Sequence, residues 1–340
     1  MQDSLKRVVE GQNLSRREAA HVMEQFMEGK ATPSQMGAFL AALRMKGETV
    51  DEITGFAEIM RRKVVPVKQS FHNTVDTCGT GGDGGRTFNV STATSILAAS
   101  LGVPVAKHGN RSVSSKSGSA DVLEALGIGA QMSAEEAETA LQQIGICFMF
   151  APLYHQSMRH VMPTRKELGI RTCFNILGPL TNPAGVKRQL LGVYSQSLTE
   201  LIASVLKELG ADRALVVASD DGLDEISVSA PTQISELKDG QVTTYSITPE
   251  ALGLACYPLR DVAGGDATQN AAIIRDIFSG QKGAARDIVL ANTAAVLYVA
   301  GVVDSLREGV RLAAEAVASG KATAKLNEMV AFAGGKQHVS

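Results

Sequence analysis

The sequence predicts an α/β protein in which a small N-terminal helical domain precedes a larger domain built on a mainly parallel central sheet. Two patterns support this prediction. Residues 1–66 show helical apolar spacing throughout, whereas from residue 70 onward short apolar runs alternate with helical segments, which is typical of a sheet with helices on its faces. With 340 residues, of which 44% are hydrophobic, the chain can bury the cores of about two domains.

Three helices are predicted in the first 65 residues. Each begins at a capping box, in which Ser or Thr is followed three residues later by Glu or Gln. Three short helices have little interior of their own, so part of their apolar surface is expected to pack on the other domain or on a second subunit, and packing wholly within the chain is equally open. The capping pairs are Ser15 with Glu18, Thr32 with Gln35 and Thr49 with Glu52, and the clearest apolar stripe is Met36, Phe39, Leu40 and Leu43.

Two donor-rich loops follow two successive predicted strands, at 73–78 and 103–107. The first loop, GTGGDGG, lets backbone N–H groups face an anion, and the helix after it, which Ser91 is expected to cap, adds partial positive charge. The second loop, HGNRSVSSKSGS, offers basic side chains and hydroxyl groups. We therefore expect one anionic ligand, a phosphate group above all, to contact both loops.

Other kinds of glycine-rich site fit less well. A GxGxxG pattern occurs at 79–84, but a dinucleotide site needs an acidic residue at the end of the next strand, where this chain has Lys107 and His108. A nucleotide-triphosphate P-loop would need Lys in place of Gly85. A flexible surface loop is the remaining alternative, although a solvent-exposed loop gives no reason for two donor-rich loops at the ends of two successive strands.

The other predicted elements continue the alternation of strands and helices. Helical segments broken by Gly178, Pro179 and Pro183 interrupt the sheet for roughly thirty residues. The expected elements are helices at 120–126 and 133–145, a strand at 146–150, helical segments at 155–168 and 172–181, strands at 188–194 and 214–218 with a helix at 198–209 between them, a hairpin at 233–247 that turns at Asp239 and Gly240, and a buried helix within 288–303.

A cluster of carboxylates follows the strand expected at 214–218. The loop SDDGLDEIS places Asp220, Asp221, Asp224 and Glu225 within six residues, at a strand end where α/β proteins put their sites. Mutual repulsion would be costly without a cation, and Mg²⁺ fits because one or two carboxylates, substrate phosphates and water usually complete its shell. A solvated acidic turn is the alternative. The expected phosphate-binding loops nearby favour the metal site over that alternative.

Composition excludes several functional classes. Lys and Arg number 33 against 35 Asp and Glu, a net charge of -2, so no basic field is available for a nucleic-acid partner. Four scattered cysteines without CxxC spacing indicate a reducing compartment, and we expect the cytoplasm. The run at 288–303 contains Asn292 and Thr293 and is shorter than the ~20 residues of a span, so no membrane association is expected.

The residues alone leave the reaction open. They specify a polyphosphate ligand and a divalent metal, but no covalent nucleophile can be placed. Such a site works by positioning and by stabilising charge on a departing group. Phosphoryl transfer and displacement at a sugar carbon both meet this description.

Five motifs, in order and at their spacing, resemble the anthranilate phosphoribosyltransferase family over essentially the whole chain: GTGGD, KHGNRSVSS, PTRKELGIRT, NILGPLTNP and DGLDE. The resemblance implies the nucleoside phosphorylase/phosphoribosyltransferase type of fold, with residues 1–66 joined by roughly 160–186 as the helical domain, and 70–159 with 187–340 as the larger one. It also implies a homodimer through the helical domain. The implied reaction, in tryptophan biosynthesis, transfers the phosphoribosyl group of 5-phosphoribosyl 1-pyrophosphate (PRPP) to the amine of anthranilate.

The resemblance further implies roles for individual residues. Asp224 and Glu225 would hold magnesium, two ions in all, on the pyrophosphate, with the Ser91 hydroxyl on one of them, and Arg165 would contact the anthranilate carboxylate. The implied substrate-binding residues are Gly79, Gly82, Asp83, Thr87, Asn89, Val90, Ser91, Thr92, Lys107, His108, Gly109, Asn110, Arg111, Ser112, Val113, Ser114, Ser115, Ser119 and Arg165, of which Gly79 and Asn110 would join Arg165 at anthranilate. Pro152, His155, Met158, Met162 and Gly178 would line the path by which anthranilate enters.

Two positions depart from the family pattern. Ser112 stands where Ala is more frequent, and Ala218 with Ser219 stands where His-Gly is more frequent, but neither change removes an implied ligand. The alternatives are a pyrimidine nucleoside phosphorylase-like enzyme, whose longer C-terminal extension is missing here, and a non-catalytic relative that binds nucleic acid, whose basic surface is missing.

Overall fold

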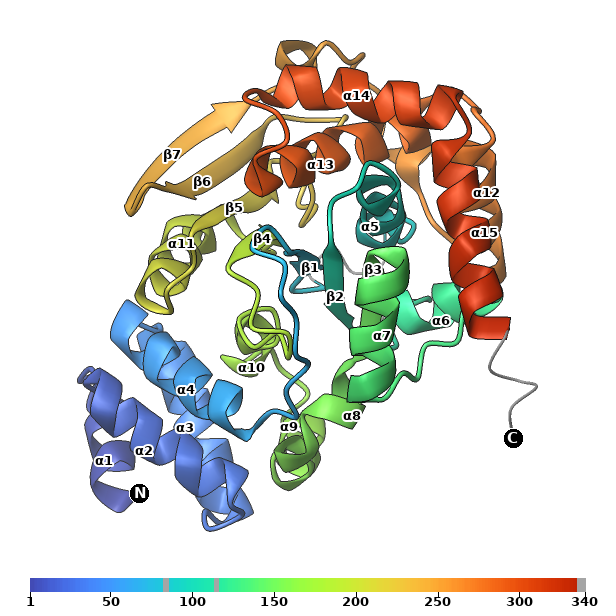
Figure 1. Ribbon diagram of the computed structural model, residues 1–340. Coiled ribbons are helices and arrows are strands. Elements are labelled where there is room, and N and C mark those ends of the chain that lie inside the picture. Colours follow the sequence, from blue (N-terminus) through green and yellow to red (C-terminus); the bar gives the residue numbers. More distant parts are fainter. Residues whose placement is uncertain (82–85, 113–115, 335–340) are drawn as a thin grey trace.

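A seven-stranded mixed sheet forms the centre of the computed structural model, which describes residues 1–81, 86–112 and 116–334 (Figure 1). The strands are β1 (Val75–Gly79), β2 (Val105–Gly109), β3 (Ile146–Phe150), β4 (Arg188–Gly192), β5 (Arg213–Ser219), β6 (Thr232–Lys238) and β7 (Gln241–Ile247). Their order is β3-β2-β1-β4-β5-β6-β7, parallel from β3 to β5 and antiparallel from β5 to β7. The predicted α/β class with a mainly parallel sheet is confirmed.

Helices cover both faces of this sheet. The helices are α1 (Gln2–Val9), α2 (Arg16–Met27), α3 (Pro33–Lys46), α4 (Val50–Lys63), α5 (Val90–Ser100), α6 (Ser119–Ala125), α7 (Ala134–Ile144), α8 (Ala151–Tyr154), α9 (Met162–Leu168), α10 (Phe174–Leu177), α11 (Thr199–Glu208), α12 (Ala267–Phe278), α13 (Ala284–Ala300), α14 (Leu306–Ala318) and α15 (Lys321–Gly334). α5 and α13 pack together against β1, whereas α11 packs on β5 and β6 and also contacts α4 of the N-terminal bundle.

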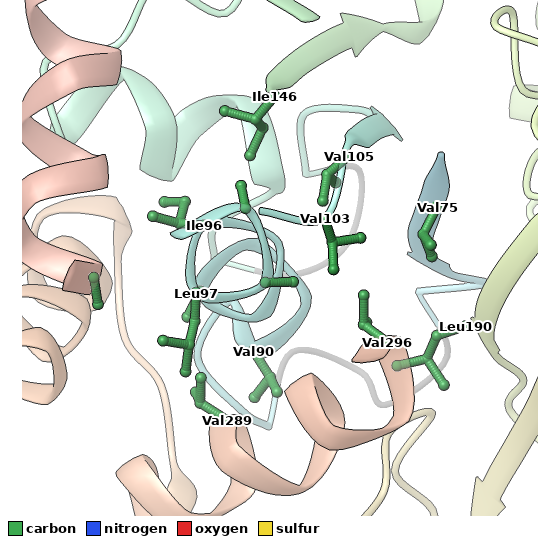
Figure 2. Close-up of a cluster of buried hydrophobic side chains, with 14 of the residues drawn as sticks. Val75, Val90, Ile96, Leu97, Val103, Val105, Ile146, Leu190, Val289 and Val296 are labelled. Carbon is green, nitrogen blue, oxygen red and sulfur yellow. The ribbon is translucent and has the colours of Figure 1, made fainter. Parts of the chain in front are cut away.

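The helix α5, which begins at the first donor-rich loop, is held in the larger of two hydrophobic cores. Figure 2 shows Ile96 and Leu97 of α5 among strand residues such as Val105 and residues of α13 such as Val289. All of these side chains are buried. The position of the helix start is therefore fixed by packing along the whole of α5.

The three predicted capping boxes of the N-terminal segment are all present. The Ser15, Thr32 and Thr49 side chains each accept a hydrogen bond from the backbone N–H three residues later, and the Glu or Gln there returns the bond. A fourth helix, α1, precedes them. It carries no side-chain cap hydrogen bond, so the capping signal that marked the other three helices is missing from it. The prediction of only three helices was therefore wrong.

The apolar stripe of α3 packs within the chain. Phe39 lies between Phe26 and Phe56 in edge-to-face contacts, with ring centroids 5.6 Å and 6.3 Å apart, and is fully buried. Met36, Leu40 and Leu43 are buried as well. Of the alternatives that the sequence left open for this stripe, packing inside one chain is the observed one.

The bundle shares its hydrophobic core with the segment that interrupts the sheet and with one face of the sheet. Val161, Phe174 and Leu177 of the interrupting segment are buried together with bundle residues and with Leu191 and Val216 of β4 and β5. The predicted helix at 155–168 is divided into a 3₁₀ turn, η1 (Gln156–His160), and α9, which carries Pro in its first turn.

The C-terminal half follows the prediction closely. The hairpin β6–β7 turns at Asp239 and Gly240, whose φ values of 51° and 72° are those of a tight hairpin turn. The apolar run expected to form a buried helix lies in α13. In the described part of the chain, no helix combines the length and the apolar character needed to cross a membrane.

Candidate active site

An open cavity of about 690 Å³ lies where the carboxyl ends of β1 and β2 face the segment that returns to the bundle. Its walls come from both donor-rich loops, the acidic loop after β5, and the segment from Ala151 to Thr181. One end is therefore rich in backbone N–H groups and charge, and the other combines apolar side chains with His155 and Arg165. Ligands of α/β proteins bind in such crevices at the carboxyl ends of strands.

The acidic loop touches the glycine-rich loop directly. The Gly81 N–H donates to Asp224 Oδ2 at 3.0 Å. A Cβ atom at Gly79 would lie 2.6 Å from the same oxygen, so only glycine permits this approach. The loops after β1 and β5 thus form one continuous wall.

The four carboxylates of the acidic loop fall into two pairs with different roles. Asp220 accepts a hydrogen bond from Gln196, and Asp221 accepts from Ser227 Oγ at 2.6 Å, so both hold the loop in shape. Asp224 and Glu225 line the cavity. The expectation of a single four-carboxylate cluster was wrong, because hydrogen bonding turns two of the side chains away.

The charged end of the cavity fits magnesium by its donor set. Two carboxylates and the Ser91 hydroxyl line the same cavity, and Mg²⁺ usually takes few protein ligands and fills its shell with phosphate and water. Within the described residues, no three His, Cys, Asp or Glu side chains are grouped as a metal site.

A buried lysine lies beside this end. Lys107 Nζ donates to the Thr77 carbonyl oxygen and to Ser91 Oγ, the latter at 3.1 Å. Burial lowers the pKa of Lys107, and the negative charge of Asp76 opposes that shift. Asp76 is itself fully buried and accepts from the His108 N–H at 3.1 Å, and burial raises its pKa. Each buried charge is therefore partly compensated by the other.

The opposite end places two guanidinium side chains, those of Arg159 and Arg165, among apolar groups. The Arg165 guanidinium lies 5.2 Å from the centre of the Phe174 ring, and burial lowers its pKa. Met158, Met162 and Pro152 line the cavity nearby. A planar aromatic anion suits this combination of an apolar wall and a guanidinium.

Two neutral histidines lie at the same cavity. The His108 and His155 rings are 5.0 Å apart, and burial lowers the pKa of His108 to about 3 and that of His155 to about 4. The Nε2 atom of each ring is buried without a hydrogen-bond partner among the described residues. Both rings are thus uncharged at neutral pH, so the positive charge at this end comes from Arg159 and Arg165.

Most of the described residues singled out in the sequence lie at this cavity. Thr92 does not; it is buried on α5. The Arg111 guanidinium is bound by Asp121 and Glu124 of the α6 region. The residues that line the cavity are Gly79, Thr87, Asn89, Val90, Ser91, Lys107, His108, Gly109, Asn110, Arg111, Ser112, Ser119, Arg165, Asp224 and Glu225, together with Pro152, His155, Met158, Met162 and Gly178. Gly82, Asp83, Val113, Ser114 and Ser115 lie outside the described residues.

Other expectations about this region need correction or addition. Asn89 is the residue that precedes α5, and Ser91 lies within its first turn, so Ser91 does not cap the helix as expected. Phe174 and Asp76 were not singled out from the sequence. An aspartate in the middle of a predicted strand was the available signal for Asp76, because a buried carboxylate needs compensating partners.

Comparison with known proteins identifies relatives of the whole chain. Residues 2–64 match the helical bundle domain of a glycosyl transferase family, and residues 72–323 match its a/b domain. Anthranilate phosphoribosyltransferase of Acetivibrio thermocellus is 53% identical over 332 residues, which is 98% of this chain and 96% of the relative. The enzyme of the same name from Brevibacillus brevis is 53% identical over 337 residues, 99% of both chains.

Solved structures agree with this relationship. The crystal structure of anthranilate phosphoribosyltransferase from Thermus thermophilus superposes with a TM-score of 0.92 at 42% identity, covering 97% of this chain and 99% of the other. The Saccharomyces cerevisiae enzyme in complex with PRPP and Mg gives a TM-score of 0.88 at 28% identity, covering 98% and 97%. The chain therefore belongs to the anthranilate phosphoribosyltransferase family.

Proposed function

We propose that this chain transfers the phosphoribosyl group of PRPP to the amine of anthranilate, giving N-(5-phosphoribosyl)anthranilate and pyrophosphate, the second step from chorismate to tryptophan. The observation that carries the proposal is the two-ended cavity, which joins phosphate-binding loops and two carboxylates to an apolar wall that carries the Arg165 guanidinium. The yeast relative was solved with PRPP and Mg, and also with 4-fluoroanthranilate. PRPP with Mg suits the charged end of the cavity, and the anthranilate analogue suits the apolar end.

The donor would occupy the charged end. Backbone N–H groups after β1, the start of α5 and the Lys107 ammonium would hold its phosphates. Asp224, Glu225 and Ser91 would hold two magnesium ions, which neutralise charge on pyrophosphate when bound. The lining of this end therefore supplies positive charge where the leaving group becomes more negative.

The acceptor would occupy the apolar end. Arg165 would bind the anthranilate carboxylate. Asn110 and Gly79, which lie nearer to the donor, would also contact anthranilate. The transfer breaks the bond between ribose C1 and a pyrophosphate oxygen and forms a bond from C1 to the anthranilate nitrogen, which loses a proton. The chain would contribute by positioning the two substrates and by stabilising charge, without a covalent intermediate.

The proposal extends to the division of the chain and its assembly. We assign residues 1–66 with roughly 160–186 to a helical domain, and 70–159 with 187–340 to the PRPP-binding domain; the family models that match residues 2–64 and 72–323 support the boundary after residue 66. We assign the active chain to a homodimer in the cytoplasm. All four cysteines are free thiols, which is consistent with that compartment.

The reaction itself can be followed by fluorescence, because anthranilate is fluorescent and its phosphoribosyl product is much less so. We expect the signal to decay only when PRPP and Mg²⁺ are both present. Decay without either of them, or none with both, would falsify the proposed reaction.

The double change Asp224→Asn with Glu225→Gln should raise the magnesium concentration needed for half-maximal rate by about tenfold or more, the factor of about 1.4 kcal/mol of lost binding. Two charges are removed while side-chain size is kept. Magnesium titrations of the initial rate measure this effect. Asp220→Asn is the matched control, since its carboxylate bonds to Gln196 and should leave the requirement unchanged. The same magnesium requirement in both variants would show that the acidic loop is a structural turn and does not bind magnesium.

Arg165→Ala should raise the KM for anthranilate far more than the KM for PRPP. A lost charged hydrogen bond is worth about 1.5–3 kcal/mol, or about 10- to 150-fold. Lys166→Ala is the control, because Lys166 carries the same charge on the same helix but lies outside the cavity. A similar rise for both substrates would instead place Arg165 in a structural role.

The outer face of α1 and α3 is the proposed dimer surface. These two helices pack together, and Val9 and Met45 on them are 65% and 87% exposed, more than any other large apolar side chain in the described ranges. Met45→Glu should halve the mass measured by light scattering and leave the thermal midpoint of the fold little changed. Phe39→Ala, on the same helix but fully buried, should destabilise the bundle by about 3–5 kcal/mol. A parent that is monomeric at micromolar concentration refutes the dimer.

A further inference from the structure

The Asn89 side chain joins the two donor-rich loops. Asn89 immediately precedes α5, yet its side chain makes no capping hydrogen bond to that helix. Its Nδ2 donates to the Ser117 carbonyl oxygen at 3.1 Å, and its Oδ1 accepts from Ser117 Oγ at 3.2 Å. Both residues line the cavity, Asn89 between the first loop and α5, and Ser117 in the second loop. This pair of bonds therefore sets the distance between the loops.

A third hydrogen bond reaches Asn89 from outside the cavity. Asn270 Nδ2 donates to Asn89 Oδ1 at 3.0 Å. Asn270 lies in the first turn of α12, is only 2% exposed and is absent from the cavity lining. Its own Oδ1 accepts from the Gly265 N–H at 2.7 Å, so both ends of this buried amide are used.

The segment before α12 also lies directly against the first loop. Thr87 and Ala263 form an antiparallel bridge, and the Gly264 N–H donates to the Arg86 carbonyl oxygen at 3.2 Å. A Cβ atom at Gly264 would come within 2.5 Å of Phe88 N, so no side chain fits between the two segments. The start of α12 is thus a fixed support behind residues 86–89.

We infer that Asn270 is a positioning residue for the PRPP site, which holds the Asn89 side chain in its place against Ser117 of the second loop. Asn270 would act on the ligand only through Asn89, from behind the cavity wall. The bond joins two neutral amides in a buried setting, where loss of one partner leaves the other unsatisfied. The acceptor end, around Arg165, lies on different elements and should not depend on it. The inference rests on the proposed function in one respect, namely that PRPP is the ligand between the loops.

The Asn270→Asp variant separates the positioning of Asn89 from the bond that Asn270 makes to Gly265 at the start of α12. The variant keeps the oxygen that Gly265 N–H needs and removes the N–H that Asn89 receives. We expect the KM for PRPP to rise about 5- to 20-fold, as for one buried donor lost, with the KM for anthranilate changed less than about twofold. Gln269→Ala is the matched control: it removes the capping box of the same helix, whose glutamine is exposed, and leaves the bond to Asn89 intact.

A second measurement needs no substrate. Hydrogen–deuterium exchange followed by mass spectrometry should show faster exchange in the peptide around Ser117 and Gly118 for Asn270→Asp than for the parent, and parental exchange for Gln269→Ala. Unchanged exchange in Asn270→Asp, or the same increase in both variants, would overturn the positioning role. A parent inactive with PRPP and anthranilate would instead overturn the proposed reaction, so the two failures can be told apart.

Discussion

The site depends on the close approach of the acidic loop to the carboxyl ends of β1 and β4. A Cβ atom at Gly192 would lie 1.7 Å from the Asp224 carbonyl oxygen, and one at Gly79 would lie 2.6 Å from Asp224 Oδ2. Neighbouring parallel strands that both end in glycine therefore admit a third loop between them. That loop brings carboxylates to the place where backbone N–H groups face outward, which is what a magnesium-bound diphosphate requires.

Buried charge is arranged around this junction in a compensated way. Lys107 reaches Ser91 from the adjacent strand, and Asp76 on β1 offsets its charge while it accepts the N–H of His108. Burial lowers the pKa of Lys107, and the negative charge of Asp76 opposes that shift next to the phosphate loops. At the other end of the cavity, the histidines are kept neutral by burial, and Arg159 and Arg165 carry the positive charge. The two substrates thus meet different electrostatic environments within one cavity.

The cavity is a consequence of how the chain returns to its N-terminal bundle. Residues that interrupt the sheet share a core with the bundle and with one face of β4 and β5, so the bundle cannot move independently of Phe174 and Leu177. The α12 segment supports the donor loops from the opposite side through Asn270. The cavity wall is therefore supported from behind by residues that do not line it, such as Leu177 and Asn270.

Features encoded within a few neighbouring residues could be predicted before the fold was known. Capping boxes such as Thr32 with Gln35, the strands expected at 73–78 and 103–107 and the hairpin turn at Asp239 proved correct, and the family motifs identified the reaction. Contacts between distant parts of the chain emerged only in the folded molecule. Folding buried the α3 stripe, divided the four carboxylates and turned the Asn89 side chain to a partner 181 residues away. Local patterns specify backbone conformation, whereas a side chain's partner depends on which surfaces the fold brings together.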